Sequence, residues 1–356
     1  MKYGLITIHN TQNYGSLLQT FSTYKAFKSL NIDIDLIDYH NDVIDSRELP
    51  ITQVRIKSIK DIIKRVIWGK AQEKKYNSMY IFLKNNTSLS RVFNKENIRE
   101  ANSQYDAFIT GSDIVWGTTI TGSDMTYFLD FASENKKKIS FSSSIGTKWD
   151  QKEQKIIKPL LQRYDNITVR EQLAADWIEE LTEKKVPVTC DPTILWEPQF
   201  WADFVLENYA PKENYVLIYA VNPDKKNIVD GIEYAKKHGK VAYFINFYSP
   251  VRGTKTIRPI NVEQWITLFA KADAVFSASY HGLLFSLYFK RKVFFYNRGE
   301  KSRMISLSKE LNIEKREGIG DNIEKDYPID YDFVHKKLAE KRQFSWQCMK
   351  NMLNIE

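Results

Sequence analysis

The chain alternates short apolar runs with longer segments in which apolar residues recur at helical spacing. Short apolar runs bounded by polar turns are typical of buried strands, and the periodic segments are typical of amphipathic helices. In the first part of the chain, the pattern predicts strands at 3–8, 32–38, 107–110, 138–143, 167–169 and 188–190, and helices at 17–29, 150–163 and 171–183.

The same alternation begins again after 198–211. It predicts strands at 215–221, 241–245, 274–278 and 293–296, and helices at 225–238, 262–272, from 282 onward and at 333–353. Alternating strands and helices indicate parallel sheets covered by helices. We therefore expect an α/β fold with two Rossmann-like domains in a GT-B-like arrangement and an inter-domain cleft. The expected divisions are 1–200, 201–332 and a C-terminal helix at 333–356.

The segment 55–75 differs from its surroundings in charge and in apolar spacing. It lies within an expected insertion, at about 52–100, of the N-terminal domain. It carries eight Lys or Arg against two acids, and its apolar residues follow helical spacing at Ile56, Ile59, Ile62, Ile63, Val66 and Ile67. One interpretation is a basic amphipathic helix that touches an anionic membrane face. The other, which we adopt, is an insertion helix that packs on the N-terminal domain and leaves its basic side in water.

Composition and charge restrict the class of protein. The 356 residues are 43% hydrophobic and 27% charged, which is typical of a folded chain of two domains. The formal charge of +8 favours anionic partners, but no zinc finger, RNP-type motif or Arg-rich tract supports nucleic-acid binding. The N-terminus lacks a signal-peptide pattern, the longest uncharged apolar run is short for a membrane span, and the cysteines form no CxxC. We therefore expect a cytoplasmic protein.

The most informative motif surrounds His281. The predicted strand 274–278 leads into a polar turn that carries this histidine, and an apolar helix follows from Gly282. A helix N-terminus attracts anions through its free amides and its dipole, and histidine exchanges protons near neutral pH. The pattern therefore predicts a phosphate or carboxylate site with an acid/base group beside it. The alternative is a hydrogen-bonded structural histidine.

Polar loops follow other predicted strands. After the first strand come Asn13, Gly15 and Ser16, where Gly15 would allow a tight turn and Ser16 could cap the next helix. These residues form either a simple helix cap or a ligand-binding loop. After the strand at 107–110 come Gly111, Ser112 and Asp113, whose carboxylate is a candidate base or an Asx-turn residue.

Two further strand ends carry candidate chemistry. The hydroxyl-rich run 140–146 contains Ser144 and Gly146, and it suits either sugar or phosphate oxygens or the close packing of a helix. Arg170 lies where a strand passes into a helix, so its guanidinium is placed to grip a carboxylate or phosphate, or to pair with Glu171. Ligands of such sheets bind beyond the carboxyl ends of the strands.

Taken in order, these motifs resemble the polysaccharide pyruvyl transferase family. The resemblance rests on N-x-G-S-x-L-Q from Asn13, G-S-D-x-V-W from Gly111, S-x-G from Ser144, V-R-E around Arg170, D-P-T from Asp191 and S-x-H-G from Ser279. It continues to a stretch with Arg298, Lys301 and Arg303, and so covers most of the chain. Two departures are Ser16, where some members carry an acid, and Ile114, where Gln is frequent.

The resemblance implies transfer of the pyruvyl part of phosphoenolpyruvate to two hydroxyls of a sugar, which gives a cyclic ketal. It also implies a GT-B-like fold, no metal and no cofactor, with phosphoenolpyruvate as donor and a glycan or lipid-linked sugar as acceptor. The expected location is cytoplasmic. A place at the inner membrane face, with a peripheral contact to the membrane, is the alternative that the basic segment 55–75 leaves open.

The resemblance also suggests roles for single residues. Arg170 and His281 correspond to residues of the donor site, with His281 as candidate acid and Asp113 as candidate base. Donor contacts are expected from Gly282 and from a clamp of three cations, Arg298, Lys301 and Arg303. Two other functions fit the same pattern: a GT-B-like glycosyltransferase that uses a nucleotide sugar, and a glycan-binding protein without catalysis.

Overall fold

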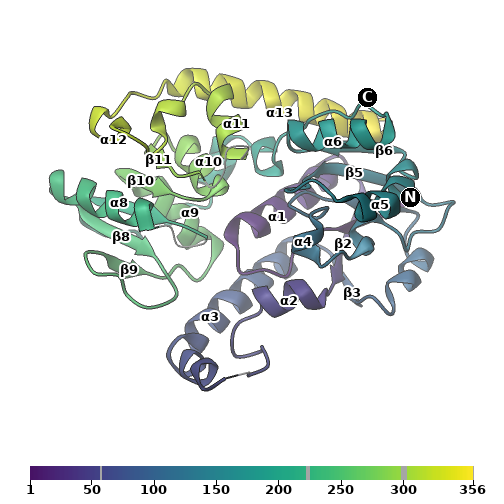
Figure 1. Ribbon diagram of the computed structural model, residues 1–356, viewed down its shortest axis with the longest axis horizontal. Helices are drawn as coiled ribbons and strands as arrows, with labels where there is room; N and C mark the ends of the chain where they lie inside the picture. The colour runs from purple at the N-terminus through teal and green to yellow at the C-terminus, as the bar shows by residue number, and fades with distance from the viewer. Residues whose placement is uncertain (57, 222–224, 298–302, 356) are drawn as a thin grey trace. The chain divides into compact units, whose positions relative to one another are not determined.

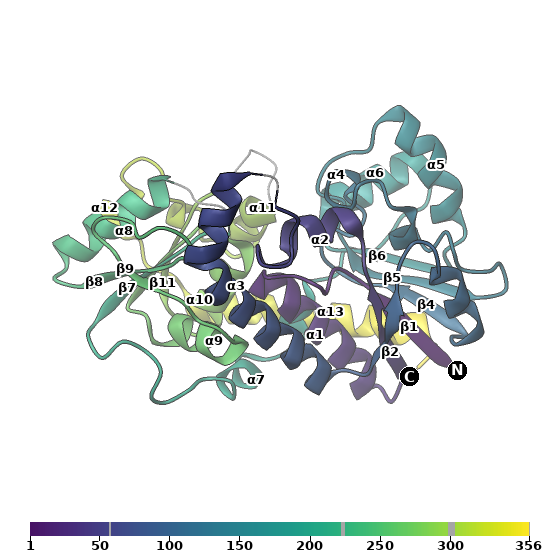
Figure 2. The same cartoon turned by 90° about the horizontal axis from the view of Figure 1, so that it is seen from below.

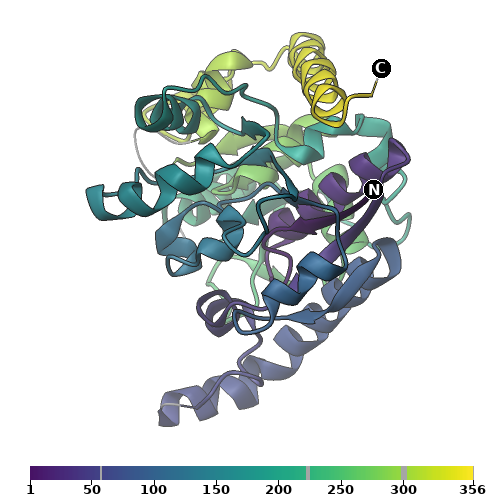
Figure 3. The same cartoon turned by 90° about the vertical axis from the view of Figure 1, so that its right-hand side faces the viewer.

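The computed structural model describes residues 1–56, 58–221, 225–297 and 303–355, and the chain divides into two compact units (Figure 1). The first unit comprises Met1–Leu49, Met79–Trp196 and Lys341–Glu356, and the second comprises Pro50–Ser78 and Glu197–Glu340. The division falls inside two helices, α3 (Ile59–Asn86) and α13 (Tyr331–Leu353), and α13 is seen as one continuous ribbon in Figure 1. Both chain termini therefore belong to the first unit (Figure 3).

The first unit is built on a six-stranded sheet in which all pairings are parallel. Its order, β3-β2-β1-β4-β5-β6, is that of a doubly wound Rossmann sheet, in which the direction of winding reverses between β1 and β4. The strands are β1 (Lys2–Ile6), β2 (Asp33–Tyr39), β3 (Leu89–Phe93), β4 (Ala107–Thr110), β5 (Lys137–Ser143) and β6 (Asn166–Val169).

Helices and an aromatic core cover this sheet. In the core, the indole of Trp116 stacks on Phe128 with ring centroids 5.5 Å apart, and both side chains are buried. Local signals fix the helix starts, as at α5, where Asp150 and Glu153 form a reciprocal capping box. The helices are α1 (Tyr14–Ser29), α2 (Asp42–Glu48), α4 (Thr118–Thr121), α5 (Gln151–Gln162) and α6 (Gln172–Thr182), with short 3-10 helices η1 (Ile98–Ser103), η2 (Met125–Phe128) and η3 (Pro192–Leu195).

The second unit repeats the plan with five parallel strands. Their order, β11-β10-β7-β8-β9, again reverses its winding, here between β7 and β10. The strands are β7 (Tyr215–Tyr219), β8 (Val241–Ile245), β9 (Lys255–Ile257), β10 (Ala274–Ser277) and β11 (Lys292–Phe295). The helices are α7 (Pro198–Ala202), α8 (Lys225–Lys237), α9 (Val262–Lys271), α10 (Tyr280–Tyr288), α11 (Arg303–Glu310) and α12 (Asn322–Lys325), with the 3-10 helix η4 (Glu314–Arg316).

The observed elements differ from the predicted ones mainly at sheet edges and helix starts. The edge strands β3 and β9 were not predicted, because neither forms a clear apolar run. Two residues of β3 are exposed, and β9 is only three residues long. Helix α1 begins three residues before the predicted start at 17, because the side chain of Asn13 accepts the N–H of Gly15 at 3.0 Å. Asn13, and not Ser16, is therefore its N-cap.

The units also differ from the predicted divisions. The segment Pro50–Ser78, expected as part of an insertion in the N-terminal domain, groups with the second unit. The C-terminal helix is no separate body, since Lys341–Glu356 groups with the first unit, where Lys137 donates a hydrogen bond to the carbonyl of Met352. Among the described residues, no helix has both the length and the apolarity needed to cross a bilayer.

Candidate functional site

In the first unit, predicted site residues meet where the sheet reverses its winding. Ser16 follows β1 and Asp113 follows β4, the two strands that flank the reversal. The hydroxyl of Ser16 donates to Oδ2 of Asp113 at 2.5 Å and also lies 3.2 Å from the carbonyl of Ile8. A doubly wound sheet binds its ligands at this switch point, because the loops on either side of it separate and leave a crevice.

The backbone of Asp113 is unusual for a residue with a side chain. Its φ is +76°, in the left-handed region that few residues other than Gly, Asn and Asp adopt. The carbonyl of Asp113 accepts the N–H of Ser144 at 3.0 Å, and its Oδ1 accepts the N–H of Ile114 at 2.9 Å. Backbone and carboxylate are therefore both held, and the carboxylate remains partly exposed. The role of Asp113 as candidate base stays a prediction.

Arg170 lies at the end of β6 with only 1% of its side chain exposed. Its Nη1 donates to Oδ2 of the buried Asp191 at 2.9 Å. Oxygens of Glu171 and Asp113 lie 3.7 and 3.9 Å from other nitrogens of the same guanidinium. One buried cation thus faces three carboxylates of the protein. Binding of a ligand anion by Arg170 stays a prediction. The alternative, an ion pair between Arg170 and Glu171, is present in the structure.

The hydroxyl-rich strand end makes internal contacts. Ser144 donates to Oε1 of Glu171 at 2.5 Å, and the N–H of Ile145 donates to the same oxygen at 3.2 Å. Ser142 donates to the carbonyl of Cys190 at 2.8 Å, and Ser143 donates to the carbonyl of Gly111 at 3.0 Å. Ser142 and Ser143 therefore tie the end of β5 to Cys190 and to the loop after β4, and the next residue, Ser144, contacts Glu171 beside Arg170.

The remaining predicted residues of this unit shape the loops. The Cβ that an alanine would have at Gly111 lies 3.1 Å from side-chain atoms of Leu5 and Thr7, so glycine lets β4 approach β1. The hydroxyl of Thr7 donates a hydrogen bond to the backbone carbonyl of Ser112 at 2.7 Å. Gly146 has a φ of +75° and Gly15 belongs to the first turn of α1.

In the second unit, His281 also lies at a switch point. It follows β10, which pairs with β7 at the reversal of winding, and it is 8% exposed. The helix α10 starts at Tyr280, two residues before the predicted start, and its N-cap Ser279 accepts the N–H of Gly282 at 3.4 Å. The amide of Gly282 is therefore engaged within the protein. A Cβ at this glycine would lie 2.2 Å from Oγ of Ser277, so its lack of a side chain serves packing on β10.

One of the three predicted clamp cations can be placed beside this turn. The guanidinium of Arg303, at the start of α11, lies 5.5 Å from the ring centroid of Tyr280, the neighbour of His281. Arg298 and Lys301 lie outside the described residues. The structure thus places His281, Gly282 and Arg303 in one region of the second unit.

A network of histidines and aspartates was not predicted from the sequence. Oδ1 of Asp38, at the end of β2, accepts from Nε2 of His9 at 3.0 Å and from Nε2 of His40 at 3.2 Å. Nδ1 of His40 lies 2.8 Å from Oδ2 of Asp45, whose Oδ1 accepts the side chain of Asn10 at 2.8 Å. The network ties α2 to the loop that leads from β1 to α1. The signal available in the sequence was the same as elsewhere, namely polar side chains at the ends of adjacent strands.

The charges in this network depend on one another. Hydrogen bonds to Asp38 and Asp45 raise the pKa of His40 to about 10, because each carboxylate takes one ring N–H. Burial opposes the ionisation of Asp38, but hydrogen bonds from both histidines outweigh it and hold the pKa of that carboxyl well below its usual range. At neutral pH, His40 is therefore an imidazolium.

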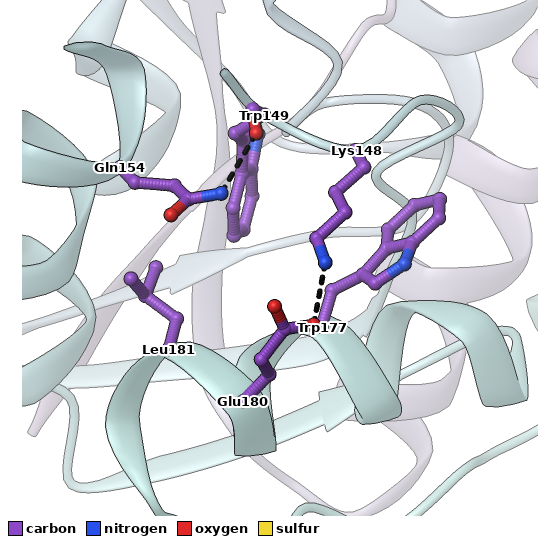
Figure 4. A pocket seen from close by; sticks show the side chains of 6 residues that line it. All are labelled: Lys148, Trp149, Gln154, Trp177, Glu180 and Leu181. Carbon is purple, nitrogen blue, oxygen red and sulfur yellow. Dashed lines mark hydrogen bonds and ion pairs between the residues drawn. The ribbon is translucent and has the colours of Figure 1, made fainter. Parts of the chain in front are cut away.

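A small pocket lies apart from these residues, between α5, α6 and the loop after β5 (Figure 4). Lys148 and Glu180 form an ion pair across it with a separation of 2.5 Å, and Gln154 donates to the carbonyl of Trp149. Its volume of about 50 Å³ suits water molecules better than a sugar ring. None of the predicted site residues lines it. Among the described residues, no three His, Cys, Asp or Glu side chains are grouped as metal ligands.

Two doubly wound sheets, each with polar residues at its switch point, define a GT-B-like α/β protein, and the predicted fold class is confirmed. The chain belongs to the polysaccharide pyruvyl transferase family, because the model of that family matches residues 13–300. This match confirms the resemblance inferred from the motifs and makes the protein a transferase of polysaccharide biosynthesis. The inter-domain cleft stays a prediction.

Solved structures support the fold alone. UDP-GlcNAc 2-epimerase from Neisseria meningitidis, bound to UDP-GlcNAc, is 13% identical, with a TM-score of 0.50 over 100% of this chain and 95% of that one. MnaA of S. aureus with UDP is 11% identical, with a TM-score of 0.55 over 100% of this chain and 98% of that one. A search of curated protein sequences gave no match.

Replacing Arg170 by methionine should lower the free energy of unfolding by about 3–5 kcal/mol, because the buried Asp191 would lose its compensating cation. Urea unfolding followed by circular dichroism measures the change. Arg316→Met is a matched comparison, since Arg316 is equally buried and bonds Asp326 at 2.8 Å in the second unit. A loss below about 1 kcal/mol for Arg170→Met, the value of a surface pair, would contradict the assigned charge balance.

The raised pKa of His40 should make stability depend on pH. Since the folded pKa exceeds the unfolded value of about 6.5, the contribution is complete below pH 6.5 and is lost as pH rises through about 10. Thermal unfolding between pH 6 and 10 should show a flatter slope for His40→Asn than for the wild type. His238→Asn, an exposed histidine of the second unit, should keep the wild-type slope. Equal slopes for all three proteins would refute the interpretation.

Proposed function

We propose that the protein transfers the pyruvyl part of phosphoenolpyruvate to two hydroxyls of a sugar in a cell-surface polysaccharide or its lipid-linked precursor, and so forms a cyclic ketal. The observation that carries the proposal is the family match over residues 13–300. The placement of the family's motif residues at the switch points of both sheets supports it. The proposal includes no metal and no cofactor, and a cytoplasmic location at the inner membrane face.

The proposed reaction begins with protonation of the methylene carbon of phosphoenolpyruvate. The first sugar hydroxyl forms a bond to C2 and gives up its proton. The bond from C2 to the phosphate oxygen breaks, phosphate leaves with the electron pair, and the second hydroxyl closes the ring. In net balance, one of the two hydroxyl protons ends in the new methyl group and the other leaves with phosphate.

Each unit contributes one kind of chemistry in this proposal. His281 is the proton donor, because imidazole is the side chain best suited to proton transfer near neutral pH. Arg303, together with Arg298 and Lys301, supplies positive charge for the donor's phosphate and carboxylate. Asp113 accepts the proton of the sugar hydroxyl, and the hydroxyl of Ser16 orients its carboxylate.

Arg170 takes a different role from the one first expected. Its guanidinium already bonds Asp191 and lies within 4 Å of two further carboxylates. In the proposal it is a positioning residue that bonds Asp191 at the end of β6 and balances the charge of Asp113, and the donor's negative charge is met by the cations of the second unit.

Ligand binding tests the donor class. Phosphoenolpyruvate at one hundred times its dissociation constant should stabilise the protein by about 2.7 kcal/mol, which thermal unfolding detects. UDP-GlcNAc, the ligand of the N. meningitidis structure, is the comparison compound. Stabilisation by UDP-GlcNAc alone would replace the proposal with a glycosyltransferase. Stabilisation by a polysaccharide alone would leave a glycan-binding protein.

Removal of the imidazole tests the acid. His281→Ala should lower the turnover of phosphoenolpyruvate by about 10²–10⁴ while acceptor binding changes little, because only proton transfer is lost. Phosphate release in the presence of a lipid-linked sugar measures turnover. His238→Ala removes an exposed histidine and should leave the rate unchanged. Normal turnover of His281→Ala would exclude His281 as the acid.

A further inference from the structure

Helix α3 turns an apolar face to solvent. Ile59, Ile62, Ile63, Val66 and Ile67 are 47–79% exposed, although all five are large aliphatic residues. Their spacing of three and four residues places them on one face, since an α-helix advances about 100° per residue. A soluble protein rarely leaves a contiguous apolar patch of this kind uncovered unless the patch has a partner.

The other side of the helix is the one that packs. Arg65 donates to the carbonyls of Ile51 and Val54 at 3.1 and 2.7 Å. The ring of Trp68 packs edge-on against Tyr248 with centroids 5.9 Å apart. Gly69 is buried, with no room for a Cβ beside Thr52. The adopted interpretation, a helix that buries its apolar stripe on the N-terminal domain, is therefore wrong in both its face and its unit.

Lysines lie along one side of the apolar face and beyond its C-terminal end. At 100° per residue, Lys60 and Lys64 flank it on one side, and Lys70 and Lys74 continue it along the next turns. All four are exposed, and within the described part of the chain no acid pairs with them. The nearest acid of the first turns, Asp61, lies on the packed side. The face thus combines five aliphatic residues with four lysines that form no ion pair among the described residues, and Glu73 is the acid that shares this face.

We propose that the segment 59–74 of α3, the helix labelled in Figure 2, lies flat on an anionic lipid bilayer. The aliphatic side chains enter the boundary between headgroups and acyl chains, and the lysines bind lipid phosphates. A second copy of the chain is a poorer partner, because a two-fold contact would bring the same lysines against one another. The inference does not depend on pyruvyl transfer, since vesicle binding is measured without turnover.

Co-sedimentation of the full chain with vesicles tests the proposal. The protein should sediment with vesicles of equal parts phosphatidylglycerol and phosphatidylcholine, and should remain in solution with phosphatidylcholine alone. Ile59→Ser/Ile63→Ser/Val66→Ser should weaken the binding about tenfold or more, because the inserted apolar area is lost. Lys60→Gln/Lys64→Gln should weaken it about fivefold for each lysine.

Helix α5 provides matched controls, because it presents the exposed Ile156 beside Lys155 and Lys158. Ile156→Ser and Lys155→Gln/Lys158→Gln should bind vesicles as the wild type does. Thermal unfolding of the α3 variants should match that of the wild type, since the altered side chains are exposed. Failure to bind anionic vesicles, or equal effects of the α3 and α5 variants, would overturn the proposal. So would a dimer in solution that the triple serine variant converts to monomers, if no vesicles bind.

Discussion

The first unit depends on one buried cation. The guanidinium of Arg170 faces carboxylates from three segments, namely the loop after β4, the start of α6 and the start of η3. Carboxylates cannot collect in a water-poor region without compensation, because their desolvation would favour protonation or unfolding. The same cation therefore bonds Asp191 at the edge of the sheet and lies near the carboxylate of Asp113, so the fold of this edge and the candidate chemistry share one charge balance.

The sequence allowed the positions of the main candidates to be predicted, but not their partners. Asp113, Arg170 and His281 follow predicted strands, and a parallel sheet gathers strand ends at one edge. Their contacts could not be predicted, because they join residues distant in sequence. Asp191 belonged to a recognised motif without a role, and its bond to Arg170 spans 21 positions.

Local competition and surface exposure explain the other differences. Asn13 and Ser16 both have side chains that can cap a helix. The hydrogen bond from the N–H of Gly15 to Asn13 makes Asn13 the cap of α1, while the hydroxyl of Ser16 bonds Asp113. In α3 the periodicity correctly indicated an amphipathic helix. Periodicity identifies the two faces of a helix, but it does not tell which face packs against the protein. In α3 the packed face is the one that carries the hydrogen bonds of Arg65 and the ring of Trp68, and the aliphatic face is exposed.

The positive φ of Asp113 limits which residues evolution could accept there. Glycine would keep the turn but lose the carboxylate, asparagine would keep the shape but lose the charge, and glutamate would keep the charge at the cost of backbone strain. Aspartate alone combines a short acidic side chain with tolerance of this conformation. Drift at this position is therefore expected to separate members that retain a carboxylate from members that retain only the turn.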